Sequence, residues 1–323
     1  MILRGISALL ALLLGTAVFA ADVTLDSARA EFVAMHSDEA QRQFTLLQAQ
    51  TPNDPAVLFY LGRLQLRQNH RKTAVQLLRR AVELKPDNVD YRIWISAAIG
   101  AYIDDVPFYR KLSLAQEIHQ HLDAALLVDP RSVDVRDGLV RFHLAAPTII
   151  GGGRDKAVAE AARLMALDRS EGSIANGVIA IHDKRYVDAE REFRAAIQAA
   201  PKSAAPRYEL GKLQQIQKNF DAAFATFEDV MQLLPRETAA YYHYAHTAAL
   251  ANQRLDSGLE KVKVFLARGP MTDEDPTPVM GYRVLGRLSA LSAKKDAARN
   301  AYQTALKLDP DNAETAAALK KLD

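Results

Sequence analysis

The run from Ile150 to Gly153, an isoleucine followed by three glycines, invites an anion-binding interpretation. Bare backbone N–H groups ahead of a helix can hold a phosphate or another anion. The other parts of a nucleotide-binding loop are missing, because no Gly-Lys-Ser/Thr follows, no strand is expected before it, and 154–156 has the composition of a first helical turn. We therefore interpret the glycines as permitting the backbone path of an extended loop.

Eight histidines raise the possibility of a metal site at two places, His119-X-His121 and His243-X-X-His246. Residues two apart on a helix point about 200° apart, so His119 and His121 cannot both face one ion. His243 and His246 lie one turn apart, but a site needs a third ligand and no nearby Cys, Asp or Glu completes it. We expect no metal and no cofactor, and we expect these histidines to face a partner or solvent.

Signatures of catalysis are also missing from the sequence. It contains no Gly-X-Ser-X-Gly, no His-Glu-X-X-His and no cysteine that could act as a nucleophile. No pair of carboxylates is placed by any positional argument. We expect the protein not to be an enzyme, and a metal- or anion-dependent enzyme is the least favoured of three hypotheses.

The elements that would position these residues follow a 34-residue register, set by Pro86, Pro201, Pro235 and Pro310 at position 32. Position 8 is glycine, position 20 is alanine and position 24 is large, in four units: Gly62, Ala74 and Leu78; Gly177, Ala189 and Phe193; Gly211, Ala223 and Phe227; Gly286, Ala298 and Tyr302. This pattern resembles the tetratricopeptide repeat, a pair of antiparallel helices. We expect the small residues to let the two helices cross closely, and the large one to fill the space between units.

The resemblance implies an all-α, right-handed superhelical solenoid of about eight helix-turn-helix repeats with a C-terminal capping helix. The expected units are 21–54, 55–88, 89–132, 133–169, 170–203, 204–237, 238–278 and 279–312, followed by the cap 313–323. Three segments exceed what stacking needs: 104–113 and 146–153, both between helices, and 269–278, which we expect to be the most flexible joint. We expect binding specificity to lie in these loops.

Composition and the first residues predict where the protein acts. A formal net charge of +2 from 41 basic and 39 acidic residues gives no support for nucleic-acid binding. Residues 1–20 read as a signal peptide with Arg4, a short apolar core and small residues before a cleavage site after Ala20. We expect a bacterial periplasmic protein without a membrane span after cleavage, and without disulfides, because the chain has no cysteine.

In the family that the chain resembles, the first helix of each repeat lines a concave groove. Carrying those positions over implies these groove residues: Phe59, Arg63, Arg67, Asp137, Arg141, His182, Tyr208, Lys212, Tyr242, His246, Arg283 and Arg287. Position 2 adds the acidic residues Asp90, Asp134 and Glu171. Basic residues outnumber acidic ones in the main set, which favours a partner with apolar anchors and some carboxylates.

The function expected from this groove is a non-catalytic protein- or peptide-binding scaffold of the cell envelope. The alternative is a structural subunit of an envelope or secretion assembly that packs through its convex face. The sequence identifies neither the partner nor the oligomeric state.

Overall fold

The protein is built of helix pairs. The computed structural model describes residues 23–322, and every regular element in that range is helical, which confirms the all-α prediction. The first helices of the pairs are α1 (Leu25–Val33), α3 (Pro55–Arg67), α5 (Val89–Tyr102), α7 (Val133–Ala145), α9 (Arg169–His182), α11 (Ala205–Ile216), α13 (Ala239–Ala251) and α15 (Pro278–Leu291). Their partners are α2 (Ser37–Gln50), α4 (Arg71–Leu84), α6 (Phe108–Val128), α8 (Arg154–Leu167), α10 (Tyr186–Ala199), α12 (Phe220–Leu233), α14 (Leu255–Arg268) and α16 (Lys295–Leu308), and α17 (Ala313–Lys320) follows them. The predicted signal peptide and its cleavage site lie outside the described residues.

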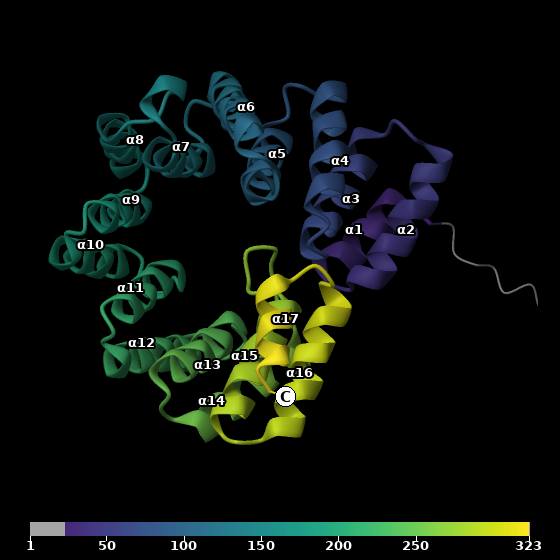
Figure 1. Ribbon diagram of the computed structural model, residues 1–323. Helices are drawn as coiled ribbons and strands as arrows, with labels where there is room; N and C mark the ends of the chain where they lie inside the picture. The colour runs from purple at the N-terminus through teal and green to yellow at the C-terminus, as the bar shows by residue number, and fades with distance from the viewer. Residues whose placement is uncertain (1–22, 323) are drawn as a thin grey trace, which may run out of the picture.

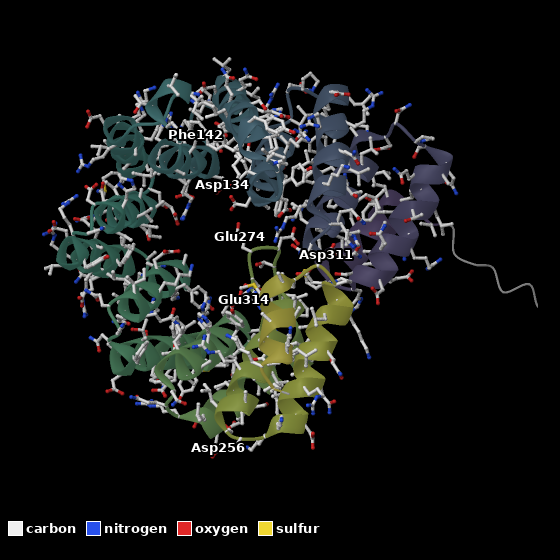
Figure 2. The ribbon with its side chains drawn as sticks, viewed as in Figure 1. Asp134, Phe142, Asp256, Glu274, Asp311 and Glu314 are labelled. Atoms are coloured by element: carbon white, nitrogen blue, oxygen red, sulfur yellow. The ribbon has the colours of Figure 1, made fainter. Side chains whose placement is uncertain are left out.

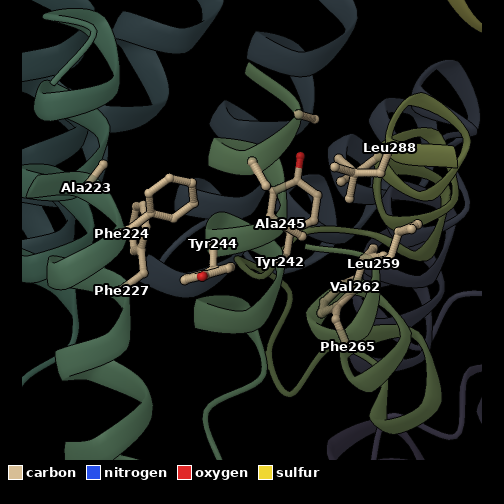
Figure 3. Packing of buried hydrophobic residues seen from close by; sticks show 13 residues of the cluster. Ala223, Phe224, Phe227, Tyr242, Tyr244, Ala245, Leu259, Val262, Phe265 and Leu288 are labelled. Atoms are coloured by element: carbon tan, nitrogen blue, oxygen red, sulfur yellow. The ribbon is translucent and has the colours of Figure 1, made fainter. Parts of the chain in front are cut away.

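Each helix packs mainly against its neighbours in sequence, as expected of a solenoid. The stack curves so far that the last pairs return beside the first (Figure 1). The solenoid as a whole therefore has the shape of a ring. The core is accordingly a chain of clusters between successive helices. In one of them α12 contributes Phe224 and Phe227, α13 contributes Tyr242, and α14 contributes Phe265 (Figure 3).

The glycines at position 8 lie directly under the large residues at position 24 of the same unit. A Cβ at Gly62 would lie 2.6 Å from Cγ of Leu78, and one at Gly177 would overlap the ring of Phe193. Leu78 and Phe193 are fully buried and have no room to move aside. The large residue therefore joins the two helices of its own unit, and our expectation that it fills the space between units was incomplete.

A left-handed residue ends the first helix in six of the eight pairs. It stands at position 15 of the unit, with φ between 53° and 64°: Met35, Asn69, Lys184, Lys218, Asn252 and Ala293. At Asn69 the next N–H, that of His70, donates to the carbonyl of Gln65 at 2.8 Å, the long hydrogen bond of a Schellman motif. The two helix pairs without such a residue are α5–α6 and α7–α8, which belong to units longer than 34 residues and have longer connections between their helices.

Those two connections differ from what the sequence predicts in one respect. The segment 104–113 is not a loop throughout, because the 3-10 turn η1 (Ile103–Asp105) ends early and α6 begins at Phe108. The extra residues thus lengthen α6 to 21 residues, against 14 in each of the other second helices. The connection from α7 to α8 holds the 3-10 turn η2 (Thr148–Ile150) and three glycines.

We predict that Gly177→Ala destabilises the protein by about 1–3 kcal/mol, because the added methyl group overpacks against a buried ring. Its matched control is Gly100→Ala in α5, where a Cβ would have nothing within 4 Å. That change should stabilise by about 0.5–1 kcal/mol, since alanine favours a helix over glycine. Urea unfolding followed by circular dichroism measures both. Equal effects of the two substitutions would show that the contact with Phe193 is unimportant.

Candidate functional site

An open cavity of about 800 Å³ lies among α5, α6 and α7. Its walls are largely apolar, and small residues make room for it: Ala97 and Gly100 on α5 are exposed, and Ala115 on α6 is half-buried. Ile93 and Ile118 add branched side chains to the same surface. Its size falls within the range, about 300–1,000 Å³, in which proteins enclose drug-sized ligands. The cavity can therefore accept several neighbouring side chains of a partner.

All three irregular segments contribute to this cavity. The extended start of α6 supplies Phe108 and Leu112, and the α7–α8 connection supplies Pro147 and Ile150. Glu274 reaches the cavity from the link between α14 and α15, more than 120 residues further along the chain. In Figure 2 Asp134 and Glu274 lie at the inner side of the ring, and Phe142 lies further out, between α6 and α7. The segments that the repeat pattern left unexplained thus meet at one place.

The link 269–277 reaches this position because it forms a compact turn. The carboxylate of Asp275 accepts hydrogen bonds from the backbone N–H groups of Met271 and Thr272, at 2.7 and 2.9 Å. Thr277 then caps α15 by accepting from the N–H of Met280. The turn projects Asp273 and Glu274 at its tip, across the ring and toward α3 and α5 (Figure 1).

Asp273 joins the two ends of the solenoid. Its carboxylate accepts from Nε of Arg63 at 2.8 Å and also from Arg67, and its side chain is only 5% exposed. The Arg63 guanidinium stacks over Trp94 at 4.2 Å, and that of Arg67 over Phe32 at 3.7 Å. Burial lowers the pKa of Arg67, while Asp273 acts in the opposite direction. The link is therefore anchored at its tip, which corrects our expectation of a flexible joint.

Other predicted groove residues are also paired within the chain. Asp137 accepts from Nε of Arg141 at 2.7 Å, and both line the 800 Å³ cavity. Lys212 lies 3.0 Å from Glu209, and Arg283 pairs with Glu314 of the capping helix. The expectation of a carboxylate-bearing partner rested on such basic side chains, most of which already have acidic neighbours.

A smaller cavity of about 360 Å³ brings together four predicted residues from α13 and α15: Tyr242, His246, Arg283 and Arg287. The rings of Tyr242 and His246 stack at 5.8 Å. Burial raises the pKa of the Tyr242 phenol to about 12. Burial, together with Arg287 and Arg283, lowers the pKa of His246 and so favours its neutral imidazole. This cavity is separate from the one at α5–α7.

The remaining predicted residues lie in neither cavity. Phe59 is a core residue, stacked on Tyr91 with 4.5 Å between ring centroids. Tyr208 is half-buried, and burial raises the pKa of its phenol, as do Glu237 and Asp275. His182 is exposed beside Asp183. The structure thus distributes the twelve predicted residues over several environments instead of one continuous surface.

The histidines are more buried than we expected. His119 stacks on Phe142 with 4.7 Å between ring centroids, and His243 stacks on Phe227 at 5.3 Å. Burial lowers the pKa of His243 well below its usual value. We expected these side chains to face a partner or solvent, whereas both are half-buried and pack on an aromatic ring. No group of three His, Asp or Glu residues within 23–322 could hold a metal ion.

The glycine run is a structural turn. The N–H groups of Gly151, Gly152 and Gly153 donate to the carbonyls of Thr148, Pro147 and His143, at 3.1, 3.1 and 2.8 Å. A Cβ at Gly152 would overlap the carbonyl of Ala146, so no other residue fits there. These three donors are committed within the chain and cannot hold an anion.

No helix within 23–322 is long and apolar enough to cross a membrane.

Two segments of the chain match the family model of the tetratricopeptide repeat, residues 56–88 and 284–312. They correspond to α3–α4 and to α15–α16, so the predicted repeat type is confirmed for these two units. A thermophilic TPR protein from Thermus thermophilus has a similar structure, with 21% identity over 59% of this chain and 97% of that chain and a TM-score of 0.49. A tetratricopeptide repeat protein from Parabacteroides merdae has 14% identity, covers 92% and 96%, and has a TM-score of 0.46. No curated protein matches the sequence.

We predict that Asp273→Asn opens the ring. The substitution leaves two largely buried guanidiniums without their shared carboxylate. Breaking a buried ion pair destabilises a protein by about 3–5 kcal/mol, and the cost should be smaller here because the Arg63 side chain is 19% exposed. Because the link can undock without unfolding a repeat, the radius of gyration from X-ray scattering should rise while helix content stays constant. Glu274→Gln, on the same turn, is the matched control and should not change the radius. An unchanged radius for Asp273→Asn would show that repeat stacking alone sets the curvature.

Proposed function

We propose that this protein is a non-catalytic protein- or peptide-binding scaffold that acts through the inner side of a solenoid of tetratricopeptide-type repeats. The observation that carries the proposal is the open 800 Å³ cavity among α5, α6 and α7. It presents an apolar surface to the interior of the ring, where a partner segment can reach it.

Physical considerations support this role for the cavity. Phe108 is 79% exposed and Leu112 is 40% exposed, and both belong to the extension of α6 that the repeat does not need. Covering apolar area contributes about 25 cal/mol per Å², so this surface gains most from a partner that inserts apolar side chains. Packed helices on three sides hold the cavity in shape, which lowers the entropy lost on binding.

The test is to fill the cavity. Peptides selected from a displayed random library on the immobilised protein should lose about tenfold or more in affinity for Gly100→Phe, because the new ring occupies the space of an inserted side chain. The matched control is Gly100→Ala, which leaves most of the space free and should bind like the unsubstituted protein. Fluorescence anisotropy with a labelled selected peptide measures the affinities, and circular dichroism checks the fold.

Two outcomes would contradict the proposal. If no peptide is selected, the interior of the ring does not bind peptides. If selected peptides bind all three proteins equally, another surface is used, as in the alternative of a structural subunit that packs through its convex face.

We further propose that the scaffold acts in the bacterial cell envelope. The support is the sequence of residues 1–20, with Arg4, a short apolar stretch and small residues before Ala21. Expression of the full chain in a Gram-negative bacterium should yield a periplasmic protein whose intact mass corresponds to a start at Ala21. A chain lacking 2–20 should remain in the cytoplasm. A periplasmic fraction that still contains residues 1–20 would contradict cleavage, and a cytoplasmic full-length chain would contradict export.

A further inference from the structure

The rim of the α5–α7 cavity carries acidic residues that helix capping does not explain. Asp90 and Asp134 stand in the first turns of α5 and α7. The caps of these helices are other residues, since Asn88 accepts from the N–H of Tyr91 and Ser132 accepts in the same way in α7. Asp90 and Asp134 make no ion pair within the described part of the chain. Their carboxylates are thus free to meet a ligand.

The same acidic character continues beyond α7 and onto the opposite wall. Glu171 occupies the equivalent place in the first turn of α9, where Asp168 is the cap. Glu274 approaches the cavity from the link on the other side. Neither makes an ion pair among residues 23–322. Burial raises the pKa of Glu171; the charges of Asp137, Asp168 and Asp134 also raise it, and Arg141, the ion-pair partner of Asp137, acts in the opposite direction.

The basic side chains at the rim do not cancel this charge. Lys111 is held 2.8 Å from Asp104, and Arg141 is held by Asp137. The opposite charges of each ion pair largely cancel, so the pair exerts little electrostatic attraction or repulsion on a ligand in the cavity. The cavity therefore combines an apolar floor with a rim whose unpaired charges are carboxylates on both sides.

We propose that the partner of this cavity is a peptide segment with apolar anchor residues flanked by lysine or arginine. The proposal rests on the peptide-binding function above and specifies the chemistry of its partner. Apolar side chains fill the floor between α5 and α6, while flanking cations lie near Asp90 and Asp134 on one side and Glu274 on the other. A partner with acidic flanks meets like charges there, which costs affinity.

The experiment compares three displayed libraries with the same randomised apolar-rich centre and fixed flanks of Lys, Glu or Ser. Exposed charge pairs contribute about 0.2–1 kcal/mol each, so several together should enrich the Lys-flanked library about tenfold over the Glu-flanked one. Binding of the best Lys-flanked peptide should weaken as salt rises from about 50 to 500 mM, because exposed charges are screened. Equal or stronger enrichment of the Glu- or Ser-flanked library would overturn the inference.

Charge substitutions localise the effect. The double variant Asp90→Asn and Asp134→Asn should bind the Lys-flanked peptide about three- to tenfold more weakly. The matched control is the double variant Asp38→Asn and Asp155→Asn, since both are exposed first-turn residues, of α2 and α8, that make no ion pair within 23–322 and do not line the cavity. Equal losses in the two variants would mean general electrostatic attraction, and the assigned site would be wrong.

The outcomes separate this inference from the function on which it rests. If the Glu-flanked library is enriched most, and its peptides bind the Gly100→Phe variant more weakly, the cavity binds peptides but the assigned charge preference is wrong. If no library is enriched, the peptide-binding function itself fails, and the partner chemistry fails with it.

Discussion

The close approach of the two helices in each unit is the constraint on which the rest of the structure depends, and in four of the eight units a glycine lies directly beneath a large buried side chain. At Gly62 and Leu78, and again at Gly177 and Phe193, the missing Cβ is the space that the partner's side chain occupies. Repeating this contact gives units of similar shape. Similar units stack with similar small rotations, and these rotations accumulate into a curved solenoid.

The curvature of the solenoid creates its inner surface, and it also brings another segment of the chain onto part of that surface. It brings the link 269–277 from the C-terminal half against α3 and α5, where Asp273 is held by two arginines. These arginines are satisfied by the protein's own carboxylate. A cavity of about 1040 Å³ borders these arginines, and the 800 Å³ cavity lies further along, among α5, α6 and α7, where the repeat departs from its regular length.

The three departures from the repeat all contribute to one cavity. The seven extra residues of α6 form one wall of the cavity, the α7–α8 connection forms another, and the link supplies Glu274. In a solenoid, insertions are tolerated where they do not disturb stacking, so the inner side can diversify while the core is kept. This explains why a chain with strongly regular units at 56–88 and 284–312 has its most distinctive surface between them.

The sequence by itself determined the helical repeat and its register, because these depend on contacts between residues close in the chain. It also pointed to the three irregular segments, but not to the helical form of 108–113. The sequence does not predict the left-handed residues at position 15, because Lys184, Lys218 and Ala293 are not the Gly or Asn residues that usually adopt this conformation. Only the tertiary structure decided that Asp273 meets Arg63, 210 residues away, and that the irregular segments share one cavity. These contacts depend on the summed rotation of several units, which no local pattern in the sequence records.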